Sequence, residues 1–402
     1  MQDLKKIRLG DVCKINVDSY STKEKWDFVN YLDTGNITNN TINSIQFIDL
    51  KNNKLPNRAK RKVKTDSIIY STVRPNQRHF GIIKSQPENF LVSTGFAVIE
   101  ADAGVLNADF LYYLLTQDTI VEVLHSIAEQ STSAYPAIKP SDIENLEIEI
   151  PDLSTQKKIA SILNSLDRKI VKNTEINNNL EQQAQTIYKS WFIDYEPFGG
   201  VLPEDWNNGT IVDLAQDVIC GKTPSTKQSE YYGGSTPFIT IPDMHGCVYN
   251  VKTERYLSQK GVASQPKKTL PPNSICVSCI GTAGLVSLVS EESQTNQQIN
   301  SIIPKKDISA YYIYLLMQTQ AEVIIKLGQS GSTIVNLNKT QFGKIPVIIP
   351  SKKVLYKFDT ICKPLFEMIL SNQKENIELA NLRDSLLPKL MSGEVDVSNI
   401  DL

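Results

Sequence analysis

One stretch without glycine or proline decides the architecture: residues 154–192, STQKKIASILNSLDRKIVKNTEINNNLEQQAQTIYKSWF. Pro151 and Asp152 precede it and residues 197–200, Pro-Phe-Gly-Gly, follow it, which are typical signals for the start and end of a helix. Alternating steps of four and three residues reach Ile159, Leu163, Leu166, Ile170, Asn173, Asn177, Leu180, Ala184, Ile187 and Trp191. This heptad pattern predicts one long helix whose apolar seam contains two central asparagines.

A second copy of this pattern begins at Ser351, 199 residues further along the chain. The corresponding seam is Phe358, Cys362, Leu365, Ile369, Asn372, Asn376, Leu379, Arg383, Leu386 and Leu390. Both asparagines recur in register, which indicates an internal repeat. The copies differ at two points: Pro364 is expected to kink the second helix or delay its start, and Arg383 interrupts the apolar seam.

The segments before each helix also correspond. Residues 66–72 match 273–279, residues 92–99 match 294–303, and residues 109–115 match 311–316. Short β-rich runs separated by turn residues predict α+β globules rather than helical bundles. We therefore expect four parts: a globule at 1–152, a helix at 153–198, a globule at 199–350, and a helix with a tail at 351–402.

The seam asparagines predict how the helices are arranged. An asparagine buried at a seam position is satisfied only by a polar partner, so it fixes the register at some cost in stability. Matching pairs in one chain favour an antiparallel coiled coil with internal pseudo-two-fold symmetry, in which Asn173, Asn177, Asn372 and Asn376 meet. The alternative is two independent helices, each packed on its own globule. Two globules joined by a stiff helix pair suit a ligand with two sites at a fixed spacing, such as duplex DNA.

Composition excludes several classes of protein. The 402 residues include 42 Lys and Arg against 44 Asp and Glu, a net charge of −2, so bulk positive charge cannot drive binding to a polyanion. Six cysteines are too few for a disulfide scaffold. No run approaches the ~18 consecutive apolar residues of a membrane span. We expect a cytoplasmic protein with reduced thiols and no membrane contact.

Local basic clusters remain compatible with phosphate binding. Residues 51–64, KNNKLPNRAKRKVK, hold seven Lys or Arg and no acidic residue, and Arg74 and Arg78 follow in a Pro-Asn turn. The second half carries basic and hydroxyl residues in 221–227 and at 267–268. Loops of this kind can neutralise phosphates, although most basic runs are merely solvated. The predicted DNA contacts are Lys60, Arg61, Lys62, Lys64, Arg74, Arg78, Lys222, Thr223, Ser225, Lys227, Lys267 and Lys268.

Catalytic signatures are weak. Gly221-Lys-Thr resembles the end of a P-loop, but position 216, where the first glycine is required, is Gln216. Cys276 and Cys279 have C-x-x-C spacing, yet in a strand this spacing puts them on opposite faces, and no second pair exists. We predict no catalytic residue and no metal site in this chain.

The whole chain resembles the specificity subunits of type I restriction–modification enzymes. The resemblance rests on residues 148–170, IEIPDLSTQKKIASILNSLDRKI, and their continuation 179–192. It also rests on Cys220-Gly-Lys-Thr-Pro-Ser225, Tyr231-Tyr-Gly-Gly234, Thr295-Asn-Gln-Gln298 and residues 382–394. The first half lacks the Gly-Lys-Thr-Pro-Ser and Tyr-Tyr-Gly-Gly signatures of the second. The loop contacts of the family are therefore assigned less directly to residues of the first half.

The resemblance implies a non-catalytic subunit with two target recognition domains, each reading half of a bipartite double-stranded DNA target. The helices would set the spacer and dock two methyltransferase subunits, and restriction subunits would join the complex. S-adenosylmethionine, ATP and Mg would be bound by those partners, with no cofactor on this chain. Exposed apolar positions beside the seams, Ile162, Tyr188, Leu355 and Leu387, are the predicted docking residues. The alternative function is a protein-scaffolding subunit without DNA specificity.

Overall fold

The computed structural model describes residues 4–131, 135–329, 335–398 and 400. The chain forms two compact units. Unit 1 comprises residues 1–168 and 379–402, and unit 2 comprises residues 169–378. Two 40-residue helices, α4 (Leu153–Phe192) and α10 (Lys352–Met391), each contribute to both units.

Unit 1 contains two four-stranded sheets and a strand pair. The first sheet has the order β2-β11-β8-β9, and the second has the order β6-β3-β10-β7. Their bounds are β2 (Cys13–Ile15), β3 (Phe28–Leu32), β6 (Gln46–Asp49), β7 (Ala59–Arg61), β8 (Ile68–Ser71), β9 (Phe80–Ile82), β10 (Phe90–Ser93) and β11 (Phe96–Ala101). The pair is β1 (Lys5–Arg8) with β12 (Glu147–Ile150), and β4 (Ile37–Thr38) and β5 (Thr41–Ile42) form a hairpin.

Unit 2 repeats this plan, as the sequence correspondence predicts. Its sheets have the orders β14-β21-β18-β19-β16 and β17-β15-β20, and β13 pairs with β22. The bounds are β13 (Asn207–Thr210), β14 (Ala215–Cys220), β15 (Tyr232–Ile239), β16 (Tyr249–Asn250), β17 (Arg255–Leu257), β18 (Ile275–Ser278), β19 (Val286–Val289), β20 (Gln294–Thr295), β21 (Ile299–Pro304) and β22 (Pro346–Ile349). A parallel strand pair lies at the equivalent place in both units, β3 with β10 and β15 with β20, and unit 2 has a second parallel pair, β16 with β19.

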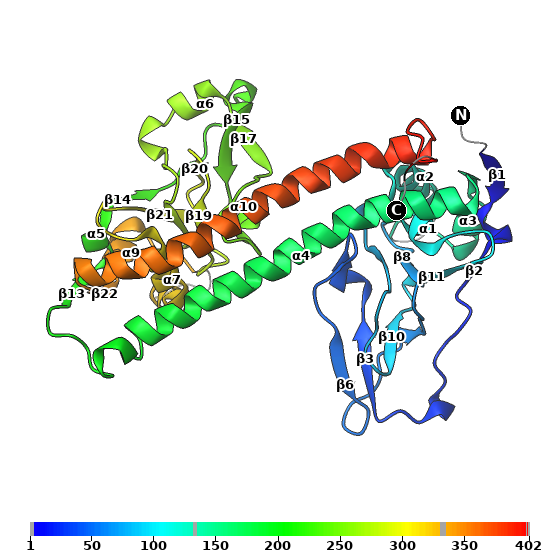
Figure 1. The fold of residues 1–402 in the computed structure, drawn as a ribbon, viewed down its shortest axis with the longest axis horizontal. Helices are drawn as coiled ribbons and strands as arrows, with labels where there is room; N and C mark the ends of the chain where they lie inside the picture. Colours follow the sequence, from blue (N-terminus) through cyan, green and yellow to red (C-terminus); the bar gives the residue numbers. More distant parts are fainter. Residues whose placement is uncertain (1–3, 132–134, 330–334, 399, 401–402) are drawn as a thin grey trace. The chain divides into compact units, whose positions relative to one another are not determined.

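Short helices cover the sheets of each unit (Figure 1). Unit 1 has α1 (Ala108–Thr116), α2 (Asp118–Glu129) and α3 (Pro140–Glu144). Unit 2 has α5 (Ile211–Leu214), α6 (Gln259–Ala263), α7 (Ala310–Thr319), α8 (Ala321–Gly328) and α9 (Lys339–Gly343). The first turns of α1 and α7 are capped alike, because the Asn107 and Ser309 side chains accept hydrogen bonds from the amides of Phe110 and Tyr312.

Helix α4 begins where local chemistry predicts. The Asp152 side chain accepts hydrogen bonds from the amides of Ser154 and Thr155 at 2.9 and 3.1 Å. These bonds satisfy amides that have no partner inside the helix, and with the Thr155 hydroxyl they lower the pKa of the Asp152 carboxyl.

The first turn of α4 is fixed to unit 1 through Gln156, which is fully buried. Its Oε1 accepts from the amide of Asn107 at 2.8 Å, and its Nε2 donates to the carbonyl oxygen of Val105 at 3.1 Å. Breaking these bonds would leave buried polar groups unpaired. The start of α4 is thereby attached to the residues that lead into α1.

Helix α10 corrects one expectation about Pro364. The helix is continuous from Lys352 to Met391, so Pro364 does not delay its start. Pro364 is exposed, and the helix has already run twelve residues before it. Packing of Leu355, Phe358 and Cys362 into the core of unit 2 offsets the hydrogen bond that the proline cannot donate.

Candidate nucleic-acid interface

The four seam asparagines meet between α4 and α10 inside unit 2. Asn173 Nδ2 donates to Asn376 Oδ1 at 2.9 Å, and Asn372 Nδ2 donates to Asn177 Oδ1, also at 2.9 Å. The 199-residue repeat converts the first bond into the second, so the two bonds are reciprocal. Residues later in α4 face residues earlier in α10, which is an antiparallel pairing (Figure 1). The predicted contacts are confirmed; their role in fixing the register stays a prediction.

The amide nitrogens of the two acceptor asparagines, Asn177 and Asn376, repeat the same symmetry. Asn177 Nδ2 donates to the carbonyl oxygen of Ile369, and Asn376 Nδ2 to that of Ile170, each at 3.4 Å. Asn173 and Asn177 are 1% and 8% exposed, so these partners replace the water that an exposed amide would have. The side-chain amides of the four seam asparagines, together called the asparagine layer below, therefore have hydrogen-bond partners on the opposite helix.

Glu375 adds an ionic contact to the asparagine layer. Asn173 Nδ2 lies 2.7 Å from Glu375 Oε2, and Lys169 Nζ lies 3.3 Å from the same oxygen. The hydrogen bond from Asn173, followed by Lys169, lowers the pKa of the Glu375 carboxyl. The sequence pattern does not identify this residue, because it lies beside the seam rather than in it.

In unit 1 the helices are joined by charged residues instead. Arg383 Nη1 lies 2.6 Å from Asp167 Oδ1, and the Tyr113 hydroxyl donates to Asp167 Oδ2 at 2.6 Å. Burial, and then the neighbouring Asp167, raise the pKa of Tyr113, so the hydroxyl keeps its proton and remains a donor. Arg383, which appeared to interrupt the seam, is therefore paired across it.

The four predicted docking residues are less exposed than expected. Tyr188 and Leu355 are 4% and 1% exposed and belong to the core of unit 2, so their prediction as exposed residues is wrong. Ile162 and Leu387 are partly buried against the core of unit 1. The helices pack on the sheet-covering helices as well as on each other, which buries apolar residues flanking the seam.

The basic segment of unit 1 is not simply a solvated loop. Lys60 and Arg61 lie on β7, an edge strand whose Ala59 is fully buried. Lys62 Nζ lies 2.6 Å from Glu24 Oε2 and 5.6 Å from the centre of the Trp26 ring. The hydrogen bond with Glu24 raises the pKa of Lys62.

Other predicted contacts in unit 1 also have partners within the unit. Lys64 lies 2.6 Å from Glu100, and Arg78 lies 2.5 Å from Asp118. The Arg74 guanidinium lies 5.2 Å from the centre of the Tyr135 ring. Arg74 and Arg78 flank the turn at Pro75–Gln77. Lys60 and Arg74 remain exposed at the surface of the unit.

In unit 2 the structure brings the two predicted basic segments together. Lys268 Nζ donates to the carbonyl oxygen of Cys220 at 2.8 Å, which places the turn at Pro266–Lys268 beside the segment that follows β14. The side chains of Lys222, Ser225, Lys227 and Lys267 are exposed, and Thr223 is half-buried. Lys268 thus supports the segment, while the other lysines face solvent.

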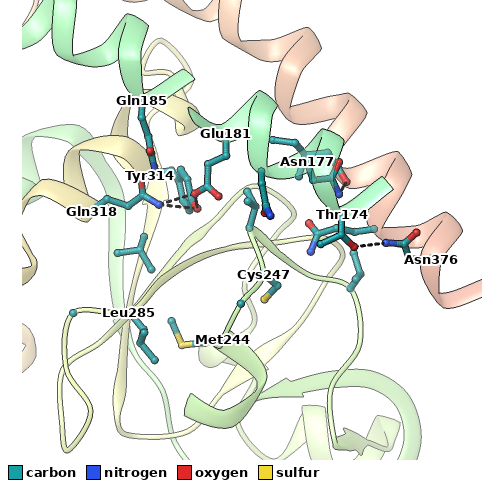
Figure 2. A pocket seen from close by; sticks show the side chains of 18 residues that line it. Thr174, Asn177, Glu181, Gln185, Met244, Cys247, Leu285, Tyr314, Gln318 and Asn376 are labelled. Carbon is teal, nitrogen blue, oxygen red and sulfur yellow. Dashed lines mark hydrogen bonds between the residues drawn. The ribbon is translucent and has the colours of Figure 1, made fainter. Parts of the chain in front are cut away.

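A cavity of about 590 Å³ lies inside unit 2 (Figure 2). Glu181 Oε1 accepts hydrogen bonds from the Tyr314 hydroxyl and Gln318 Nε2 at 2.7 and 2.8 Å. Amides and apolar side chains, including Asn177 and Met244, form other parts of the lining (Figure 2). No lysine or arginine lines this cavity, so its chemistry does not suit phosphate.

The described part of the chain contains neither a cluster of metal-ligating side chains nor a membrane-spanning helix. Among residues 4–131, 135–329, 335–398 and 400, no group of three or more His, Cys, Asp or Glu could hold a metal ion. No helix within the described part of the chain is long and apolar enough to cross a membrane.

Known proteins match both halves of the chain. A family model described as the type I restriction modification DNA specificity domain matches residues 1–182 and 203–379. The chain belongs to this family. The specificity subunit of the type I restriction enzyme HindI from Haemophilus influenzae is 35% identical, over 98% of this chain and 100% of its own length. That of MjaIX from Methanocaldococcus jannaschii is 26% identical, over 99% of this chain and 94% of its own length.

A solved structure supports the fold. The type I restriction–modification S subunit from M. genitalium aligns with a TM-score of 0.61 at 16% identity, covering 97% of this chain and 96% of that one. The family match and the relatives establish the role of a DNA specificity subunit. Each match of the family model covers one copy of the repeated fold, so each unit contains one recognition domain.

Proposed function

We propose that this specificity subunit reads a bipartite duplex, with one half-site bound by each recognition domain and the spacer set by α4 and α10. The observation that carries the proposal is the duplicated fold with a reciprocal asparagine layer between its two long helices. A repeated reader in one chain matches a target with two separately read parts. A helix pair in one register gives those parts one preferred spacing.

The protein assembly is part of the same proposal. Two methyltransferase subunits would dock along the helices, with S-adenosylmethionine bound by those subunits, and restriction subunits would bring ATP and Mg. This chain would supply recognition of the DNA sequence and no catalytic group or cofactor. We keep the cytoplasm as the proposed location. The polar and apolar surfaces that α4 and α10 leave exposed, including Ile361 and Met368, are available for such docking.

DNA affinity would come from two kinds of contact. Lysines and arginines on the surface loops would neutralise phosphates, which makes binding dependent on salt. A few side chains in each domain would reach base edges, and each good bidentate contact discriminates by about 1–3 kcal/mol. Among the predicted contacts, the exposed Lys60, Arg74, Lys222, Lys227 and Lys267 are the strongest candidates for phosphate.

A spacer series tests the proposal. The two half-sites are first read from the methylated adenines in DNA of cells that express the chain with its methyltransferase subunit. Duplexes with one base pair added to or removed from the spacer are then titrated with the complex. One added pair rotates the second half-site by roughly 35° and moves it by about 3.4 Å. We expect affinity to fall by about 10³ or more, towards the non-specific value.

Matched controls separate the alternatives. One base pair added outside the target should leave the affinity unchanged. Equal affinity for all spacers would contradict a fixed spacing, while leaving DNA recognition by each domain intact. If duplex binding by the complex does not depend on salt or sequence, the chain is instead a protein-scaffolding subunit.

A further inference from the structure

We infer that Gln297, supported by Thr223 and flanked by Lys222, is a phosphate contact in unit 2 that positions the DNA without reading its sequence. This inference rests on the proposed function, since it assigns one contact of the DNA-bound state. It concerns the segment Cys220–Pro224 and the turn 296–298, together called the cradle below. The turn joins β20 to β21.

The cradle is built from bonds that hold its backbone. The Lys222 amide donates to the carbonyl oxygen of Thr295 at 2.9 Å, and Gln265 Nε2 donates to the carbonyl oxygen of Lys222 at 2.7 Å. The Tyr232 hydroxyl donates to the carbonyl oxygen of Pro224 at 2.8 Å. Together with the bond from Lys268 to Cys220, these contacts fix the segment from several sides. A contact point fixed in this way loses little entropy when it meets a ligand.

Gly221 allows the segment Cys220–Pro224 to approach the turn 296–298 closely. A Cβ at this position would lie 2.1 Å from the carbonyl oxygen of Asn296 and 2.2 Å from Thr295 Oγ1. Both distances are far below van der Waals contact, so only glycine permits the approach. The approach places Thr223 beside Gln297.

Gln297 is an exposed residue whose amide oxygen is held by Thr223. Thr223 Oγ1 donates to Gln297 Oε1 at 2.7 Å, whereas the Gln297 residue as a whole is exposed. The next residue is arranged similarly, because Gln298 Oε1 accepts from Asn296 Nδ2 at 3.0 Å. With the amide oxygen occupied, Gln297 offers N–H donors to solvent. Lys222, next to Thr223 in the chain, adds an exposed ammonium group.

The amide hydrogens of Gln297 and the ammonium group of Lys222 are donors, which favours one class of ligand. Glutamine reads adenine through both its amide oxygen and its amide nitrogen, and here Thr223 already uses one of the two lone pairs of the oxygen and fixes its direction. A phosphate oxygen needs only donors and positive charge. The cradle therefore fits the DNA backbone better than a base edge.

The corresponding turn of unit 1 lacks this arrangement. The turn between its corresponding strands, β10 and β11, is Thr94-Gly95, which is one residue shorter and contains no glutamine. This turn of unit 1 therefore offers no counterpart of Gln297. Sequence reasoning predicted Lys222 and Thr223 but missed Gln297, because an uncharged residue far along the chain gives no signal until the fold places it beside them.

The test uses the complex with its methyltransferase subunit and fluorescence anisotropy at several salt concentrations. The probes are the cognate duplex and duplexes with one base changed in the half-site of unit 2. We expect Gln297→Ala to weaken binding to all of these duplexes by the same factor, about 3–10-fold. We expect Lys222→Ala to reduce the slope of log K against log salt by about 0.9.

Further variants keep the inference falsifiable. Thr223→Val should weaken binding about as much as Gln297→Ala, and Thr223→Ser should restore it. The control Gln86→Ala changes an exposed glutamine in unit 1 and should have no effect. Loss of discrimination at one base in Gln297→Ala would overturn the phosphate assignment in favour of base reading. Unchanged binding in Gln297→Ala, with normal binding by the parent, would overturn the inference alone, whereas absent DNA binding by the parent would overturn the proposed function.

Discussion

Replacing Asn177 and Asn372 by leucine, singly and together, tests whether the asparagine layer trades stability for register. Asn177 is 8% exposed and its Oδ1 lies 2.9 Å from Asn372 Nδ2. Asn177→Leu removes that acceptor and leaves the half-buried amide of Asn372 without it. An unsatisfied buried donor costs about 1–3 kcal/mol, and the added apolar burial of leucine offsets part of this cost. We expect each single variant to lose about 1–2 kcal/mol.

The double variant should behave differently. With both amides gone, two leucines of similar volume face each other and neither leaves the other's amide unpaired; only the long bond to the carbonyl oxygen of Ile369 is lost. The free energy of unfolding should return to within about 1 kcal/mol of the parent or exceed it, which is a coupling of about 1–3 kcal/mol. The register should become less specific, because an apolar seam tolerates sliding by a heptad.

Urea unfolding measured by tryptophan fluorescence provides the assay. The chain has three tryptophans, and Trp191 and Trp206 both lie in or against the core of unit 2. A Trp26→Phe background removes the signal of unit 1, so the transition of the unit that contains the asparagines is followed alone. Asn178→Leu, at the exposed neighbouring position, serves as the control. Additive losses in the double variant, with a coupling below about 0.5 kcal/mol, would refute the reasoning.

Three further outcomes are expected. Arg383→Ala should destabilise unit 1 by roughly 1–2 kcal/mol in urea unfolding, because it leaves the partly buried carboxylate of Asp167 without its cation. Gly221→Ala should lower the stability of unit 2 by roughly 1–3 kcal/mol, since its Cβ meets a backbone oxygen at 2.1 Å, whereas Gly35→Ala, with open space around it, should be neutral in the same thermal scan. The hydrogen bond from Asn173 lowers the pKa of the Glu375 carboxyl from its ordinary value of 4.5, so the ionised carboxylate stabilises the fold above pH 4.5. This contribution is lost as the pH falls below that value. A urea midpoint with the same acid dependence in Glu375→Gln would contradict this.

Local and periodic features of this protein follow from its sequence. The run without glycine or proline predicts α4, because helix formation depends on neighbours along the chain; the helix begins at Leu153 as predicted but ends at Phe192, six residues before the predicted bound of 198. The 199-residue repeat predicts that the two units contain corresponding β-rich segments and that the four asparagines correspond. Such patterns need no knowledge of distant contacts, since a period of 3.5 residues marks one face of a helix wherever the partner lies.

Contacts across long separations were decided only by the tertiary structure. A heptad shows which face of a helix is apolar, but Tyr188 and Leu355 lie beside that face and are buried by the core of unit 2, which no local pattern describes. Likewise, a run of lysines predicts positive charge, yet Lys62 and Lys268 bond groups 38 and 48 residues away in the chain. Burial and pairing are properties of what the fold brings near a side chain, whereas helix formation and periodicity are properties of the chain itself.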